Sequence, residues 1–253
     1  MNTPRNTLAA SLLIPLLSAC VDGPARVHIS LTGVSNQVAA KSLDASDAEG
    51  APVLIDSAFA NVRHIQLDIP EDSEGCVEEE LEAPVLCESG KVVVEGPFVF
   101  DLMTGASTPS LDEVTLPSGT YKRIDVRLDD AEPSDGLVEE DDAMAELSLL
   151  VRGAVDVDGD LVEFGLALQF NEDARFEEQG GILVEGDSTL PLSLNVAEWF
   201  DGVDLAACIA SDEIEPGDNG VYWIDEDVSG GDCSDVERDL KENIKESGQI
   251  DGA

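Results

Sequence analysis

The feature that most constrains the fold of this chain is the alternation of apolar residues on both sides of Asp158-Gly159. This dipeptide favours a two-residue hairpin turn. With the turn placed there, uncharged residues face each other across two strands, and a slip of one residue would destroy that arrangement. The sequence therefore predicts an antiparallel hairpin over residues 147–170. The expected pairs are Val155–Val162, Gly153–Phe164, Val151–Leu166, Leu149–Leu168 and Leu147–Phe170.

The same alternation recurs along the chain and predicts further strands. Pro97 indicates an edge or a bulge within one of them. Residues 33–57 are small and polar, and we expect a long loop there. Apolar residues four apart, from Val236 to Ile244, predict one short helix, and Ser234 and Glu237 at its start have capping-box spacing. The other expected strands are Val27–Leu31, Ile65–Ile69, Lys91–Leu102, Ile124–Leu128 and Leu190–Val196.

These elements predict an all-β fold: an antiparallel β-sandwich with long acidic loops and one short C-terminal helix. We expect the sandwich to span residues 25–200. Residues 201–253 are expected to form an acidic loop that contains a disulfide, then the helix and a flexible tail.

Residues 1–20 combine a charged amino end, a short apolar run and a cysteine. Arg5 precedes an apolar run from Leu8 to Leu17, and two small residues then lead to Cys20. The run is too short to span a membrane, which takes ~20 apolar residues. Leu-Ser-Ala-Cys resembles a lipobox, which implies that residues 1–19 are removed and Cys20 is lipidated. Residues 20–24 would then be a lipid-anchored tether. Val21 after the cysteine favours the outer membrane over the inner one.

The charge of the chain limits its partners. It has 13 Lys and Arg against 55 Asp and Glu, a net charge of −42. Such a charge argues against nucleic acid and against anionic lipid as binding partners. The acidity fits either a saline habitat, where ions screen the repulsion, or cation binding, and the sequence leaves both open.

The five cysteines support export with a lipid anchor. If Cys20 carries lipid, four remain, and four cysteines allow three pairings. The simplest pairing joins Cys76 to Cys87 and Cys208 to Cys233, because each bridge then closes one local loop.

Further motifs resemble an uncharacterised family of bacterial lipoprotein domains. They are the Gly-Pro-Phe-Val-Phe-Asp-Leu run at 96–102, the Leu-Pro-Ser-Gly-Thr-Tyr run at 116–121, and the opening strand Val27–Thr32. The family's Asp-Ala-Pro after Leu-Thr is absent, since residues 33–35 are Gly-Val-Ser. The resemblance implies an immunoglobulin-like or prealbumin-like sandwich over residues 25–200 and brings no catalytic residues.

The search for chemistry yields few candidates. Tyr222 and Trp223 are the expected ligand contacts, because exposed aromatic residues often anchor binding. No metal site is predicted, and calcium is kept as an alternative at two acidic loops. Their candidate ligands are Glu139, Glu140, Asp141, Asp142, Asp225 and Asp227.

The sequence predicts a membrane-anchored lipoprotein of the bacterial cell envelope that acts as a structural or ligand-binding β-sandwich and not as an enzyme. We expect a monomer with an envelope or extracellular ligand. Two alternatives stay open. One is a calcium-stabilised, adhesin-like surface domain, and the other is an envelope hydrolase that uses His28 or His64.

Overall fold

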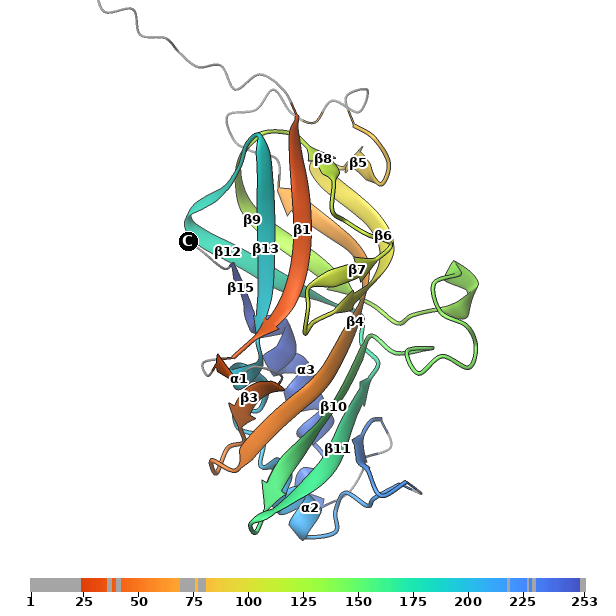
Figure 1. The fold of residues 1–253 in the computed structure, drawn as a ribbon, viewed down its shortest axis with the longest axis vertical. Coiled ribbons are helices and arrows are strands. Elements are labelled where there is room, and N and C mark those ends of the chain that lie inside the picture. Colours follow the sequence, from red (N-terminus) through yellow and green to blue (C-terminus); the bar gives the residue numbers. More distant parts are fainter. Residues whose placement is uncertain are drawn as a thin grey trace, which may run out of the picture.

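The computed structural model of the protein describes residues 24–35, 38–39, 42–68, 76, 81–217, 219–226, 228 and 231–250. Two β-sheets and three helices form an elongated molecule (Figure 1). In chain order the elements are β1 (Ala25–Val34), β2 (Val38–Ala39), β3 (Ser42–Ser46), β4 (Pro52–Asp68), β5 (Val85–Glu88), β6 (Lys91–Asp101), β7 (Ala106–Thr108), β8 (Val114–Leu116), β9 (Gly119–Leu128), β10 (Leu149–Val157), β11 (Asp160–Leu168), β12 (Glu172–Val184), β13 (Asp187–Asn195), α1 (Val196–Trp199), α2 (Leu205–Ala210), β14 (Tyr222–Ile224), α3 (Val236–Glu246) and β15 (Gly248–Ile250). Short 3-10 turns lie at Pro133–Asp135 and Gly231–Cys233.

The central element is β4, a strand of 17 residues that runs through the whole of the larger sheet. Up to residue 60 it pairs with β10, and near its start also with β3. From residue 62 it pairs with β9, while β6 lies along its other edge. We call the part with β3, β10, β11 and β14 the lower half of the large sheet, and the part with β6, β9 and β12 the upper half (Figure 1).

The upper half forms one layer of a sandwich, and the small sheet forms the other. The small sheet has the order β15-β13-β1-β8. Alternate residues of β1 from Ala25 to Leu31 are buried, as expected for a strand with one face on the core. A single continuous apolar cluster then runs from the sandwich into the lower half. The all-β sandwich prediction is confirmed, but β1 pairs with β13, and β11 with β14, in parallel, so both sheets are mixed.

The predicted hairpin is confirmed for four of its five pairs. β10 and β11 join Val155 to Val162 and continue in register to Leu149 and Leu168. The fifth pair, Leu147 with Phe170, is wrong. The Ser148 hydroxyl replaces it, since it accepts a hydrogen bond of 2.7 Å from the Phe170 N–H.

The loop predicted over residues 33–57 is wrong. β3 and the first residues of β4 lie there, and this part of β4 pairs on both edges. Alanines continue its buried face, since Ala58 and Ala60 are fully buried after Val53 and Ile55. Small buried residues give a weak apolar signal in a sequence, because they can also be read as loop residues.

The bulge predicted at Pro97 is confirmed. The register between β4 and β6 shifts between Val62 and His64, opposite Gly96-Pro97. A Cβ at Gly96 would lie 2.6 Å from the Arg63 carbonyl oxygen, so only glycine fits this close approach of two strands.

Tyr121 fixes the entry into β9. Its side chain is fully buried, and its hydroxyl donates a hydrogen bond of 2.6 Å to the Pro117 carbonyl oxygen. Burial raises the pKa of the Tyr121 phenol, so the hydroxyl stays protonated and remains a donor. A tyrosine bonded to the backbone a few residues upstream is the tyrosine corner known from immunoglobulin-type sandwiches.

Residues after 200 belong to both sheets. β14 extends the large sheet beside β11, and β15 extends the small sheet beside β13. The predicted helix is α3, and its stripe of Val236, Leu240 and Ile244 is buried. Its N-cap is Asp235 rather than the expected Ser234, and no side chain caps it. In the described part of the chain, no helix has the length and apolarity that a membrane crossing requires.

Candidate functional site

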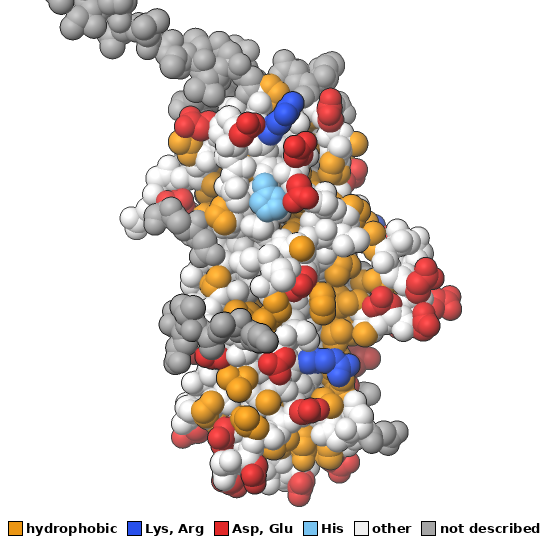
Figure 2. Space-filling view, in the orientation of Figure 1, with side chains coloured by type: hydrophobic (Ala, Val, Ile, Leu, Met, Phe, Trp, Pro, Cys, Tyr) orange, Lys and Arg blue, Asp and Glu red, His pale blue; other side chains and the backbone are white. Residues whose placement is uncertain are grey.

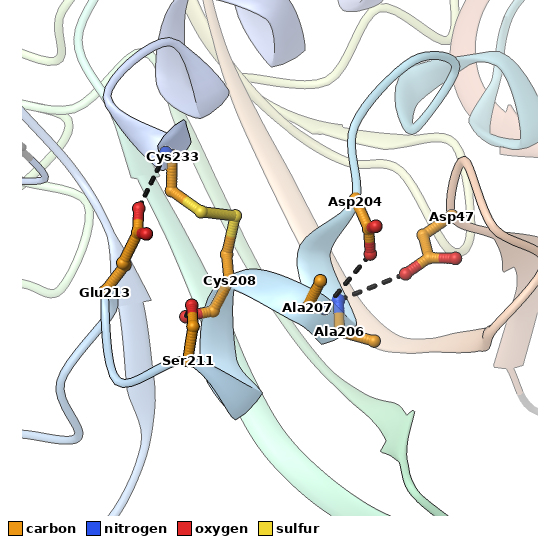
Figure 3. Close-up of a disulfide and its surroundings, with 8 residues drawn as sticks. All are labelled: Asp47, Asp204, Ala206, Ala207, Cys208, Ser211, Glu213 and Cys233. Carbon is orange, nitrogen blue, oxygen red and sulfur yellow. Dashed lines mark hydrogen bonds between the residues drawn. A yellow bond between two sulfur atoms is a disulfide. The ribbon is translucent and has the colours of Figure 1, made fainter. Parts of the chain in front are cut away.

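Both predicted disulfides form. Cys76 bonds to Cys87, and Cys208 bonds to Cys233, with a Cα–Cα distance of 5.8 Å in each. Cys208 lies on α2 at the end of the molecule that also holds the β10–β11 turn (Figures 1 and 3). Cys20, the predicted lipidation site, lies outside the described residues.

Two carboxylates, the buried Asp47 and the exposed Glu213, order the segments around the Cys208–Cys233 bridge (Figure 3). Asp47, which is 5% exposed, accepts a hydrogen bond of 3.1 Å from the Ala206 N–H at the start of α2. Glu213 accepts one of 2.9 Å from the Cys233 N–H. Both acidic side chains therefore stabilise the backbone around the bridge.

The two predicted contact residues lie on opposite faces of β14, because side chains alternate along a strand. Tyr222 packs against the main core and Trp223 packs on the outer face, which points away from that core. Both are partly exposed. Only Trp223 can therefore belong to a contact surface on the outer face of the lower half.

Trp223 is held by a glycine and an arginine on neighbouring strands. Gly165 of β11 pairs with Trp223, and a Cβ at position 165 would lie 2.3 Å from the indole ring. Arg152 of β10 pairs with Gly165, and its guanidinium carbon lies 4.8 Å from the ring centroid of Trp223. This cation–π contact is worth about 0.5–1 kcal/mol at an exposed position.

The surface around this contact is mostly apolar. We call it the Trp223 face. Its members are outer-face residues of four strands, and Arg152 is the one cation among them. The exposed Asp56 lies in the bulge of β4 between Leu54 and Ser57, so the face also carries one acid. Asp44 pairs with Leu54 and Glu163 with Ala154, so these two acids lie at its edges. The members of the Trp223 face are Leu54, Ser57, Phe59, Leu150, Arg152, Ala154, Gly165, Ala167 and Trp223.

The acidic loop between β9 and β10 borders the Trp223 face. Its Ala131, Val138 and Met144 form a second apolar cluster with Leu150, and Phe59 and Trp223 pack against that cluster. Figure 2 shows acidic side chains gathered on this projecting loop and apolar side chains beside its base. The loop therefore forms an acidic rim next to an apolar surface.

Polar contacts fix the base of this loop. The buried Asn61 of β4 donates a side-chain hydrogen bond of 2.8 Å to the Asp129 carbonyl oxygen. Arg63 forms an ion pair of 2.6 Å with Asp135. Burial raises the pKa of the nearby Asp130 carboxyl, while a hydrogen bond from Ser148 opposes that shift. The rim is thus attached to β4 and β10 at several points.

The acidic residues considered for calcium that the structure describes form no group of metal ligands. An open hollow of about 630 Å³ beside the loop is lined by Glu139, Glu140 and Asp141. A larger hollow next to it is lined by Glu140 and Asp142. Within the described ranges, no three His, Cys, Asp or Glu side chains are arranged to hold a metal ion. Asp227 lies outside the described residues, so the loop at 225–227 is described only in part.

The two histidines considered for hydrolysis lie on different sheets. His28 of β1 lies beside Asp112, with Nδ1 and Oδ1 3.1 Å apart, and its side chain is 41% exposed. His64 of β4 contacts Gln66 at 2.9 Å. They do not lie together, so they cannot share a metal ion or a substrate.

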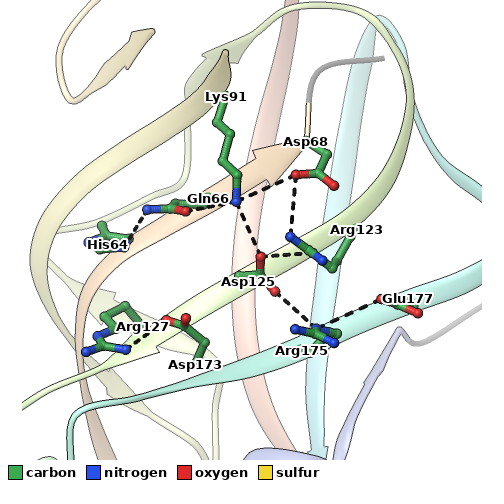
Figure 4. A network of polar contacts seen from close by, with 10 residues as sticks. All are labelled: His64, Gln66, Asp68, Lys91, Arg123, Asp125, Arg127, Asp173, Arg175 and Glu177. Carbon is green, nitrogen blue, oxygen red and sulfur yellow. Dashed lines mark hydrogen bonds and ion pairs between the residues drawn. The ribbon is translucent and has the colours of Figure 1, made fainter. Parts of the chain in front are cut away.

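The outer face of the upper half carries a dense ionic network (Figure 4). At its centre is Asp125, whose side chain is 10% exposed. The nearest carboxylate oxygen of Asp125 lies 2.9 Å from Arg123 Nε, 3.5 Å from Arg175 Nε and 3.7 Å from Lys91 Nζ. Asp68, Asp173 and Glu177 pair with the same or neighbouring cations. The carboxylates match these cations, which makes this face a neutralised structural network.

Comparison with known proteins gives no relative for this chain: no family model, no curated protein and no solved structure matches it.

Proposed function

We propose that this chain is a lipoprotein of the bacterial cell envelope, anchored through Cys20, whose β-sandwich binds an envelope or extracellular partner through the Trp223 face. The observation that carries the proposal is the contrast in charge. A chain with a net charge of −42 has, on one sheet face, a mostly apolar surface that carries only Arg152 and the exposed Asp56 as charged residues. Apolar surface bordered by polar residues is typical of protein interaction sites.

The position of Cys20 close to the start of β1 supports a Trp223 face that points away from the membrane. β1 begins at Ala25, so four residues separate it from Cys20, and four residues span at most ~14 Å. β1 begins at one end of the long axis, and the β10–β11 turn lies at the other (Figure 1). A lipid at Cys20 would hold the sandwich near the membrane and leave the lower half, with Trp223, pointing away from it.

The anchor is tested on protein extracted from native membranes. We expect an intact mass for residues 20–253 plus acyl groups, rising by four hydrogens on reduction of the two disulfides. A Cys20→Ser variant should carry no acyl groups. An unlipidated wild-type mass, or acyl groups that persist in the Cys20→Ser variant, would contradict the anchor.

The contact surface is tested by photo-crosslinking in cells. A photo-reactive residue replaces Ala154 on the Trp223 face, and in a second strain it replaces Thr189, an exposed residue of β13 in the small sheet. We expect a discrete covalent adduct from position 154 and none from position 189. No adduct from position 154, or the same adduct from both positions, would argue against a binding role for this face.

The calcium-stabilised adhesin and the hydrolase remain separate hypotheses. The first predicts that a chelator lowers the melting temperature. For the second, the pair of His28 with Asp112 gives one imidazole an orienting carboxylate. Hydrolysis that is lost in a His28→Gln variant would favour it over the binding module.

A further inference from the structure

The Trp223 face has the properties of a surface that is completed by another molecule. Phe59 and Trp223 pack against the second apolar cluster and yet stay partly exposed. Leu54 and Ala154 continue the apolar surface to the next row of residues, and they are also partly exposed. A partner that covers this row would remove apolar area from water, which stabilises the complex.

The charges around the face select the chemistry of that partner. Asp44 and Glu163 lie at its edges, and the loop tip from Glu139 to Asp142 forms the acidic rim. Groups of opposite charge placed over such a rim attract it and speed association. The net charge of −42 adds long-range attraction for a basic partner and repels a second copy of the chain or an anionic polymer.

The central cation does not require an acidic partner. The guanidinium of Arg152 already lies against the electron-rich Trp223 ring, 4.8 Å from its centroid. The ring therefore already balances part of the positive charge of this exposed arginine. The apolar centre and the acidic surroundings therefore point to the same ligand.

We infer that the Trp223 face binds an amphipathic segment of a partner protein, with an apolar stripe that covers Trp223 and Ala154 and with lysine or arginine on its flanks. The inference rests on the proposed function and specifies the partner's chemistry. Such a segment places its apolar stripe on Leu54, Ala154 and Trp223, and its basic flanks over the acidic rim.

A fluorescence titration of the lipidated mature chain in non-ionic detergent tests this inference. The probe is a short peptide with leucine along one face and lysine along the other. Trp199 is fully buried and bonded to Ser247, so Trp223 is the indole that reports binding. We expect a blue shift of the emission and weaker quenching by acrylamide as the peptide binds.

Matched peptides and variants separate this mode of binding from simple attraction between opposite charges. Peptides with glutamate in place of lysine, or with serine in place of leucine, should bind at least about tenfold more weakly, which is about 1.4 kcal/mol. Ala154→Lys should weaken the Lys/Leu peptide by a similar factor, because it places a cation on the apolar face. Thr189→Lys adds the same charge on the small sheet and should change the affinity less than about twofold.

Three results would overturn the inference. One is equal binding of the Lys/Leu and Lys/Ser peptides, and another is equal weakening by Ala154→Lys and Thr189→Lys. The third is a stable dimer of the wild-type chain that Ala154→Lys dissociates, since a second copy would then occupy the face. If the Lys/Leu peptide fails while the adduct from position 154 persists, the partner's chemistry is wrong and the proposed function stands.

Discussion

The outer face of the large sheet differs between its two halves, although β4 runs through both. In the upper half, Asp125 is surrounded by Lys91, Arg123 and Arg175, so charge is buried and neutralised (Figure 4). In the lower half, the Trp223 face is mostly apolar, with Arg152 and Asp56 as its charged residues, and it lies next to an acidic rim. Charge is therefore distributed unevenly over this very acidic chain. The upper face satisfies its charges internally, and the lower face leaves apolar surface for contact.

The largest expected effect on stability comes from the disulfides, one in each half. Replacing Cys208 and Cys233 with alanine opens a loop with a sequence separation of 25 and should cost about 3.5 kcal/mol of unfolding free energy. The same change at Cys76 and Cys87 opens a separation of 11 and should cost about 2.8 kcal/mol. Urea unfolding of both double variants measures the difference. A larger loss at Cys76–Cys87 would contradict the entropic explanation.

The next effect tests whether the upper face is structural. Asp125→Asn removes the carboxylate that three cations share. We expect the free energy of unfolding to fall by about 3 kcal/mol. This is the lower end of the range for breaking a buried ion pair, because the three cations are partly solvated. Asp173→Asn is the control. Its carboxylate is 49% exposed and pairs with Arg127, so the loss should stay below about 1 kcal/mol. Equal losses in urea unfolding would show that Asp125 has no special role.

The contact between Gly165 and Trp223 gives a matching test in the lower half. Gly165→Ala places a Cβ against the indole ring and should cost about 2 kcal/mol through overpacking. In a Trp223→Ala background the same substitution should cost nearly nothing, because the ring is gone. A double-mutant cycle measures this coupling, expected at about 1–2 kcal/mol. Additive effects of the two substitutions would mean that the ring does not lie over Gly165.

The smallest effect is a dependence on pH in the upper half. Burial lowers the pKa of the His64 imidazole, partly offset by the charge of Asp173. The pKa of His64 is therefore lower in the folded protein than in the unfolded chain, where it is about 6.5. The neutral imidazole of His64 stabilises the fold above the unfolded pKa. That contribution is lost as the pH falls through the pKa of the folded protein. A His64→Gln variant should therefore lose less melting temperature than wild type between neutral pH and pH ~5. Parallel curves for the two proteins would remove His64 from this explanation.

The sequence predicted the parts of the fold in which apolar residues alternate and a turn fixes the register. The Asp158-Gly159 hairpin shows both signals, and four of its five pairs are confirmed. The first part of β4 was missed because its buried positions include Ala58 and Ala60. The resemblance to a lipoprotein domain family stays a prediction, as does the lipid on Cys20.

The candidate site was only partly predictable for a different reason. Trp223 was predicted as a ligand contact because exposed aromatic residues often anchor binding, but its partner Arg152 was not. Their contact depends on the parallel pairing of β14 with β11, which joins segments far apart in the chain. No local pattern encodes that pairing, so neither the role of Gly165 nor the different faces of Tyr222 and Trp223 could be derived from the sequence.

The most direct test of the contrast between the two halves measures binding to cell envelopes. Envelopes come from cells that lack this chain, and the Cys20→Ser protein is added so that no lipid contributes to retention. We expect the protein to sediment with the envelopes. Ala154→Lys should weaken this binding by about tenfold or more, because Ala154 lies in the proposed interface. Thr189→Lys should leave it unchanged, because Thr189 lies outside that interface. Equal retention of all three proteins, or none by any of them, would contradict a contact role for the Trp223 face.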